Sequence, residues 1–495
     1  MTAPSTSLLA TRRGVLTLLL CAVQFLDLVD SSIMNVALPS IRRDLGFSQQ
    51  SLQWVLSGYV VTYGGFLLLG GRAADLLGRR RMLVAGTIVF ALCSLAGGLA
   101  ANAGMLVGAR VAQGVGAALM APAGLSILIT TFTEERDRTR ALGVWGAISG
   151  LGAAVGVFGG GVLSEGPGWR WVLFVNIPVC VLIVATAFRL VPADRRHAPR
   201  AGFDVGGAIL VTGGMLLGIY ALVKAPDTGW GTARTIGELA TAGVLLAAFA
   251  VNESRVRDPL FPFSILRVKG LAAANATQLI AFAGFLSMFF FLTLYMQNVL
   301  GYSPIRGGSA YLPVTAGIVL AAGVSSQLMP RVGTRPIIAG GSLIAAGGMY
   351  YLSRIPVDGS YLTDLLPGLL VMSVGLGAVF VTVTTAANAG VPTDKAGLAA
   401  GLLNTSLQLG SALGLAIFSA LATARTNHVL AEHAAPAQAL TSGLQRALLA
   451  GSLSVLAAAF IALRAPNIRT QTAQPKPETE ADTPNFVIPA ADPAD

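Results

Sequence analysis

The chain has 495 residues, of which 54% are hydrophobic and only 11% are charged. Soluble globular proteins carry roughly 25% charged residues, so this chain cannot cover a water-facing surface of ordinary size. Its net charge of +10 could suggest a nucleic-acid partner, but long apolar runs separate the basic residues and leave no solvated basic face. The composition therefore indicates an integral membrane protein that does not bind nucleic acid.

The N-terminus places Arg12 and Arg13 immediately before the first apolar run. This pair is similar to the start of a twin-arginine export signal. A cleaved signal would end at a small-residue cleavage site, whereas this run continues past Asp27 as far as Pro39. We therefore expect residues 1–13 to be a cytoplasmic N-terminus that precedes a retained first transmembrane helix.

Fourteen apolar runs are long enough to span a bilayer, which requires about 20 mostly apolar residues per helix. Continuous runs of this length differ from the short alternating segments of a membrane β-barrel. The sequence therefore predicts an all-α integral membrane protein with 14 transmembrane helices. In chain order the predicted spans are 14–38, 51–71, 81–101, 104–130, 140–163, 169–191, 204–224, 233–251, 271–298, 308–329, 335–353, 363–388, 396–422 and 444–464.

The Lys and Arg residues orient these helices, because cytoplasmic loops carry an excess of positive charge. With a cytoplasmic N-terminus, 23 of the 33 basic residues fall on the inner side, and Arg110 lies inside a span. Both termini are then expected in the cytoplasm, and the polar tail 465–495 is expected to be disordered. The excess of Arg over Lys suggests a GC-rich bacterial genome and hence a bacterial plasma membrane. Nine basic residues fall on the outer side: Arg42, Arg43, Arg170, Lys224, Arg234, Arg306, Arg354, Arg425 and Arg446.

Two spans rich in small residues, around 143–161 and 397–414, indicate an internal duplication. They are the fifth and the thirteenth spans. If the seventh and eighth spans are an insertion, each becomes the fifth helix of a six-helix half. We therefore expect a six-helix bundle at 14–191, two additional helices at 204–251 and a second six-helix bundle at 271–464.

Asp27 and Asp30 interrupt the first span three residues apart, so their side chains share nearly one helical face. An acidic group at the bilayer centre costs roughly 2.5–3.5 kcal/mol on insertion scales, and such a group is usually retained for function. Burial disfavours an ionised carboxylate, so a carboxyl group in this place can bind and release a proton. We predict a proton- or cation-binding role for Asp30. For Asp27 this role and a purely helix-positioning hydrogen bond both stay open.

Arg110 stands inside the fourth span, and Gln113 follows one helical turn later. At 1.5 Å per residue, Asp30 lies roughly 12 Å and Arg110 roughly 9 Å below the outer surface, so the two can meet. An Arg that approaches a carboxylate favours its charged form, which offers a way to couple proton release to a rearrangement. The alternative is a static Arg that caps backbone carbonyls. Asn35 in the first span completes this predicted proton-coupling and substrate site.

The segment 71–81 predicts a tight cytoplasmic turn between the second and third spans. Its acidic residue and its arginines can form ion pairs that break when a transporter changes state. The alternative is a plain positive-inside anchor, which explains the arginines but not the acidic residue. The segment 329–335 is a weaker counterpart. The residues of this predicted cytoplasmic gate are Gly71, Asp75, Gly78, Arg79 and Arg80.

Gly152, Gly156 and Gly160 recur every four residues along one stripe of the fifth span, with Gly161 beside them. Small residues at this spacing let two helix backbones approach closely, which predicts helix packing at an outer gate. The spacing and the missing preceding strand argue against a dinucleotide-binding loop. The chain also contains no Gly-Lys pair of a Walker A motif, so no nucleotide cofactor is expected.

Neither a metal site nor a disulfide is expected, since each of the three cysteines stands alone in an apolar stretch. His428, Glu432 and His433 are close in sequence and suggest metal ligands at first sight. However, the segment 423–443 is Ala-rich and is interpreted as loop-like. No catalytic residue and no cofactor are predicted, and the chain is not expected to be an enzyme.

Five segments together resemble the major facilitator superfamily, and in particular its fourteen-helix drug:proton antiporter branch. The resemblance runs from about residue 14 to 464. It implies proton-driven export of amphipathic or cationic compounds by alternating access between two six-helix halves, in a monomer within the lipid bilayer. The matching segments are 30–39 in the first span, 71–81, 110–116, 156–161 and 169–178.

Two positions depart from the pattern of that branch. Val157 stands where the fifth-helix motif has a proline, and Leu76 stands where the loop motif has a basic residue. Two other functions stay open from the residues alone. One is a proton-coupled uptake symporter for a nutrient or siderophore, and the other is a membrane sensor or scaffold that transports nothing.

Overall fold

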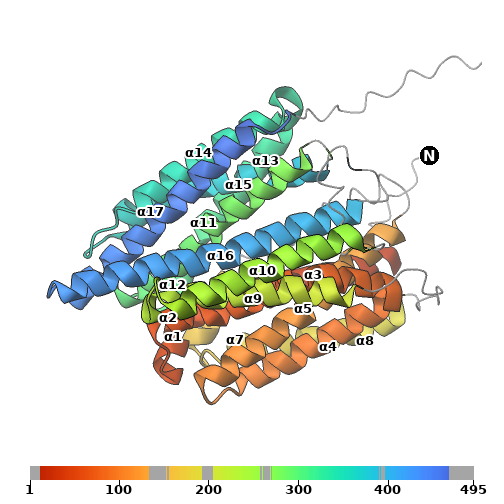
Figure 1. Ribbon diagram of the computed structural model, residues 1–495, viewed down its shortest axis with the longest axis horizontal. Coiled ribbons are helices and arrows are strands. Elements are labelled where there is room, and N and C mark those ends of the chain that lie inside the picture. The colour runs from red at the N-terminus through yellow and green to blue at the C-terminus, as the bar shows by residue number, and fades with distance from the viewer. Residues whose placement is uncertain are drawn as a thin grey trace, which may run out of the picture.

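The computed structural model describes residues 12–132, 152, 155–191, 204–256, 270–388 and 396–467, and the single positions 259, 268 and 391. In these ranges the regular elements are helices, and no strand occurs. Eleven of the described helices are long and apolar enough to cross a membrane. The chain is therefore an all-α membrane protein. The axes of most of its long helices lie roughly parallel to one another (Figure 1).

The N-terminal helices coincide with the predicted spans and pack as one group. In this group α4 contacts α5 and α8, α3 contacts α5, and α1 contacts α5 and α8. The predicted fifth span is described only in part, as the apolar helix Val155–Glu165. The other elements are α1 (Arg12–Leu45), α2 (Gln49–Leu52), α3 (Trp54–Leu77), α4 (Arg79–Gly98), α5 (Ala103–Thr131), α7 (Trp171–Phe174) and α8 (Asn176–Leu190).

The C-terminal helices form a second group, in which α11 contacts α16 and α17, and α14 contacts α15 and α17. Its long helices again coincide with predicted spans. Its elements are α11 (Leu271–Asn298), α12 (Pro304–Ser309), α13 (Leu312–Val332), α14 (Thr334–Leu352), the π-helical turn η3 (Tyr361–Leu365), α15 (Leu366–Asn388), α16 (Ala396–Ala431) and α17 (Pro436–Leu463).

Two further helices, α9 (Val205–Thr228) and α10 (Ala233–Arg255), pack against each other. α9 also contacts α3 of the first group and α16 of the second, which themselves touch (Figure 1). The Thr212 hydroxyl of α9 donates to the Gly65 carbonyl of α3 at 3.1 Å. The pair α9–α10 therefore lies along the line where the two groups meet.

The interpretation of 423–443 as loop-like is wrong. α16 continues through Ala431, and α17 begins at Pro436, so only a short turn separates the two helices. Alanine is the strongest helix former, and a helix that leaves the bilayer can continue in water. The hydropathy of the sequence indicates a helix only as far as the apolar run extends. The predicted span 396–422 therefore ends before α16 does.

The turn between α3 and α4 has a counterpart between α13 and α14, as the weaker resemblance of 329–335 to the loop 71–81 predicts. Gly78 joins the first two helices with φ 109°, and Gly333 joins the second two with φ 87°. Side chains with a Cβ rarely adopt such positive values, so glycine is required at both turns. A glycine with a positive φ therefore joins two helices at corresponding turns of the two helix groups.

The two groups contact each other at the end of the molecule that the sequence assigns to the outside. The Gln297 amide of α11 donates to the Val36 carbonyl of α1 at 3.0 Å. The Ile305 amide of α12 donates to the Glu165 carboxylate at 3.2 Å. These contacts close the predicted outer side between the groups.

Candidate functional site

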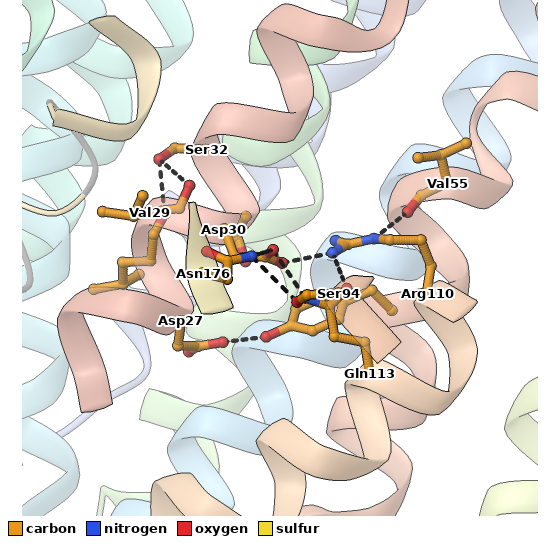
Figure 2. A network of polar contacts seen from close by, with 12 residues as sticks. Asp27, Val29, Asp30, Ser32, Val55, Ser94, Arg110, Gln113 and Asn176 are labelled. Carbon is orange, nitrogen blue, oxygen red and sulfur yellow. Dashed lines mark hydrogen bonds and ion pairs between the residues drawn. The ribbon is translucent and has the colours of Figure 1, made fainter. Parts of the chain in front are cut away.

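A buried ion pair between α1 and α5 forms the centre of the candidate site (Figure 2). The Arg110 Nη1 atom lies 2.5 Å from the Asp30 Oδ2 atom, and the two side chains are 1% and 0% exposed. The Arg110 Nε atom also donates to the Val55 carbonyl of α3 at 3.0 Å. The contact between Asp30 and Arg110 that the depth estimate predicts is therefore present, and the same Arg also caps a carbonyl.

Neutral polar side chains complete the surroundings of Asp30. Gln113 Nε2 and Asn176 Nδ2 both donate to Asp30 Oδ1, at 2.9 and 2.6 Å (Figure 2). Gln113 also accepts from Arg110 Nη1 at 2.7 Å and donates to the Ser94 hydroxyl of α4 at 2.9 Å. Together with Arg110, these donors fix the position of the Asp30 carboxyl group from three sides.

Asn176 lies in the sixth span, next to a one-residue interruption between α7 and α8. Pro178 has no backbone N–H to donate to the carbonyl four residues earlier, and its ring crowds that carbonyl, so a helix breaks just before it. The chain accordingly ends α7 at Phe174 and starts α8 at Asn176. Asn176 is fully buried at this start, where its amide can turn toward α1.

Asp27 lies beside this network with its own partner. Its carboxylate accepts a short hydrogen bond from the Tyr59 hydroxyl of α3, and its side chain is only 4% exposed. The Arg110 guanidinium stacks on the Tyr59 ring, 4.4 Å from the ring centroid. Tyr59 therefore links the two acidic residues of α1: it bonds one directly and contacts the Arg that holds the other.

A small cavity of about 30 Å³ lies next to the ion pair, between the two helix groups. Arg110 and Tyr59 line it from the first group, and Leu286 and Ser411 line it from α11 and α16. Asn35 also lines the cavity, but its amide donates to the Ser31 carbonyl of its own helix at 3.0 Å and does not join the network. Cavities that hold drug-sized ligands measure roughly 300–1,000 Å³, so this state is closed around the site.

The predicted cytoplasmic gate lies at the turn between α3 and α4. Gly71 lies within α3, and Gly78 forms the turn itself. Arg79 and Arg80 are the first two residues of α4. Arg80 Nη2 donates to the Phe188 carbonyl of α8 at 3.0 Å and stacks over the Phe188 ring. The Asp75 side chain lies outside the described residues, so the gate ion pair stays a prediction.

The predicted glycine stripe packs against α1 just beside the acidic residues. A Cβ atom at Gly156 would lie 2.8 Å from the Val29 carbonyl oxygen, and one at Gly160 would lie 2.7 Å from that of Ile33. Gly152 faces the same helix one turn earlier, at Phe25 and Leu28. Such close approach between two backbones leaves no room for any larger side chain.

Gly161 faces a different neighbour, in the second helix group. A Cβ atom there would lie 2.7 Å from the Ile305 Cα atom of α12, and one at Gly308 would lie 2.7 Å from the Val157 carbonyl oxygen. The helix Val155–Glu165 therefore contacts α1 with one face and α12 with the other. Val157, which stands where the motif has a proline, lies at this contact, with its carbonyl oxygen facing Gly308.

Sequence reasoning missed three members of the network: Tyr59, Ser94 and Asn176. Asn176 lies in the segment 169–178 whose resemblance to the branch was noted, so that segment carried a signal. Ser94 carries none, because a serine in an apolar helix is ordinary. His428 and Glu432 lie 3.4 Å apart on an exposed helix face, and no metal-binding group of three such residues occurs in the described part of the chain.

Comparisons with known proteins place the chain among membrane transporters. The family model described as the Major Facilitator Superfamily matches residues 20–415. The puromycin resistance protein pur8 of Streptomyces alboniger is 41% identical over 429 residues, which cover 85% of this chain and 84% of that protein. The cephamycin export protein CmcT of Amycolatopsis lactamdurans is 39% identical over 402 residues, which cover 81% of this chain and 83% of that protein.

The fold also matches solved structures. A bacterial homologue of the human lysosomal transporter Spinster, in an inward-facing and unoccupied conformation, superposes with a TM-score of 0.63. The match covers 92% of this chain and 97% of that chain at 17% identity. At this identity the likeness shows the arrangement of the helices alone.

Proposed function

We propose that this chain, which belongs to the major facilitator superfamily, exports amphipathic antibiotic-like compounds in exchange for protons. The relatives named for puromycin resistance and cephamycin export support the substrate class and the direction. The observation that carries the coupling is the buried pair of Asp30 and Arg110, because Arg110 also lines the cavity between the two helix groups. One residue thus touches both the proton-binding group and the space for the substrate.

The exchange follows from the charge balance of this pair. While Asp30 is ionised, the guanidinium is held between its carboxylate, Gln113 and the Val55 carbonyl. A proton that enters from outside neutralises Asp30 and leaves the buried Arg110 without its counter-charge. An unbalanced buried charge is costly, so protonation favours a rearrangement that exposes Arg110 to the cavity or to water. The cycle ends when the proton leaves toward the cytoplasm and the pair forms again.

Alternating access between the two helix groups supplies the path for the substrate. The groups are closed at the predicted outer side through the helix Val155–Glu165 and α12, and the central cavity is too small for a drug. We assign residues 14–191 and 271–464 to the two moving bundles and 204–251 to the pair beside them. Opening then requires the close contacts at Gly161 and Gly308 to separate.

The proposal includes a topology and an oligomeric state. Both termini lie in the cytoplasm of the bacterial plasma membrane, as the excess of basic residues on one side of the predicted spans indicates. The protein is proposed to act as a monomer, as members of the superfamily commonly do. Its partners are the bilayer, protons and a small molecule.

The test uses the purified protein in proteoliposomes with an imposed pH gradient, with radiolabelled puromycin and a cephamycin as probes. Export in exchange for protons predicts that substrate moves against the direction of proton flow and that collapse of the gradient stops it. Movement of substrate and proton in the same direction would establish the uptake symporter instead. A protein that moves no member of a broad panel of amphipathic antibiotics would leave only the sensor or scaffold.

A further inference from the structure

A polar pocket of about 350 Å³ lies far from the ion pair, where the ends of α14, α16 and α17 meet. Three arginines line it, each from a different element. Arg354 follows the end of α14, Arg425 lies on α16, and Arg446 lies on α17. These are three of the nine basic residues that the sequence places on the outer side. Outer segments carry fewer basic residues than inner ones, so the convergence of three arginines in one outer pocket is a candidate anion site.

The positive charges in this pocket have no carboxylate partner in the described part of the chain. The ion pairs found there involve other arginines and His428. Arg425 Nε donates to the neutral Ser442 hydroxyl at 3.0 Å, and Arg354 bonds the Tyr350 hydroxyl and stacks on its ring. Three cations that line one pocket repel one another, and a bound anion would relieve that repulsion. Arg is also the residue best suited to phosphate, which accepts several of its N–H groups at once.

The predicted topology places this pocket at the depth of the lipid headgroups. α14 has 19 residues and is therefore roughly 28 Å long, close to the thickness of the hydrocarbon core. Because α14 starts at the predicted cytoplasmic side, Leu352 ends it at the outer boundary, and Arg354 follows two residues later. Gln445 Nε2 donates to the Ile355 carbonyl at 2.7 Å, which holds α17 at this level.

Below the pocket, the outer faces of α14 and α17 are apolar. Leu343 and Ile344 on α14 are 52% and 46% exposed, and Leu453 and Phe460 on α17 are 57% and 61% exposed. The two helices contact each other and lie at the edge of the molecule (Figure 1). Tyr350 lies between this apolar surface and the arginines, as aromatic residues do at membrane interfaces. A ligand with a phosphate head and apolar chains matches both surfaces.

We propose that this pocket binds the phosphate group of an anionic phospholipid of the outer leaflet, with Arg354, Arg425 and Arg446 around the phosphate. The acyl chains lie along α14 and α17. The site is separate from the transport site, so it stands or falls independently of the proposed efflux.

The test titrates the purified full-length protein in detergent with phosphatidylglycerol and measures bound lipid by native mass spectrometry. Each arginine near an anionic headgroup contributes enough that its loss should weaken binding about fivefold. Arg446→Gln is the first variant, because that side chain makes no hydrogen bond among the described residues and its loss should not disturb folding. Arg446→Lys should restore part of the binding. Arg43→Gln removes an exposed outer arginine outside the pocket and should bind phosphatidylglycerol as the wild type does.

The triple variant R354Q/R425Q/R446Q decides the proposal. Loss of phosphatidylglycerol binding, with unchanged binding by Arg43→Gln, is the expected result. Equal binding by the triple variant and the wild type would overturn it. A parallel titration with inorganic phosphate distinguishes the source of the anion. The lipid assignment predicts that millimolar phosphate does not displace phosphatidylglycerol, and displacement would overturn that assignment.

Discussion

The Asp30 carboxylate and the Arg110 guanidinium meet at 2.5 Å, with almost no exposure of either side chain. Two opposite charges in such surroundings depend on each other. Loss of one partner leaves an uncompensated buried charge, whereas loss of both leaves none. This dependence makes the pair a test of the proposed coupling.

The first prediction concerns the stability of the pair. Arg110→Gln should destabilise the protein by about 3–5 kcal/mol, because it leaves the Asp30 carboxylate buried without a cation. The double variant D30N/R110Q should be less destabilised than the sum of the two single variants. Thermal unfolding of the detergent-solubilised variants measures this directly. Additive effects would mean that the two side chains do not interact energetically.

The second prediction concerns proton coupling. Asp30→Asn should abolish substrate-driven proton movement in proteoliposomes, since an amide cannot exchange a proton at this position. The matched control is Asp44→Asn, which removes an acidic group of the same helix. Asp44 pairs with Arg170 at 2.6 Å, but both side chains are largely exposed, and the pair lies at the outer end of α1. Full coupling in Asp30→Asn would contradict the role assigned to that residue.

The third prediction concerns Asn176, which orients Asp30 without carrying charge. Asn176→Leu should cost about 1.5–3 kcal/mol in stability, the usual value of a hydrogen bond to an ionised group. Asn176→Asp should lower the stability further, because it places a second acidic group where Asn176 Nδ2 now lies, 2.6 Å from Asp30 Oδ1. The unfolding temperatures of the two variants show which of them is less stable. Wild-type stability of Asn176→Leu, which can donate no hydrogen bond, would contradict the role assigned to Asn176.

The fourth prediction uses two glycines of one helix. Gly156→Ala adds a methyl group 2.8 Å from the Val29 carbonyl oxygen, so it should destabilise the packing of α1 by about 1–3 kcal/mol. It should also reduce transport. In Gly159→Ala the methyl group meets no atom within 4 Å, and alanine is the better helix former. Gly159→Ala should therefore be neutral or slightly stabilising in the same unfolding and efflux assays. Equal effects of both changes would exclude a special role for the stripe.

Most of the helices can be predicted from the sequence, because in a bilayer every backbone polar group must be bonded within its own helix. An apolar run of about 20 residues then permits little else than a spanning helix. The same rule explains the error at the α16–α17 turn. Outside the bilayer a helix persists without hydropathy to mark it, so the apolar runs end before α16 ends at Ala431 and begin after α17 starts at Pro436.

The residues that form the candidate site are harder to predict from the sequence than the helices are. Asp27, Asp30 and Arg110 stand out because a charge inside a span is costly and therefore noticeable. Tyr59 and Ser94 carry no charge, and their partners lie on other helices, so no local pattern marks them. Asn176 is marked only by the resemblance of the segment 169–178 in which it lies. The arginines of the lipid pocket follow the same logic, since Arg354 lies far from Arg425 and Arg446 in sequence.

The sequence by itself determined that the chain is a helical membrane protein, where most of its described spans lie and which charges inside a span need a counterpart. These properties follow from the cost of placing polar groups in hydrocarbon, which acts on each segment separately. The depth estimate from the sequence already brings Asp30 and Arg110 together, whereas only the tertiary structure decided that Tyr59 is the partner of Asp27. It also decided that Gly156 faces α1 while Gly161 faces α12. Such pairings depend on how helices pack against one another, and no segment contains that information alone.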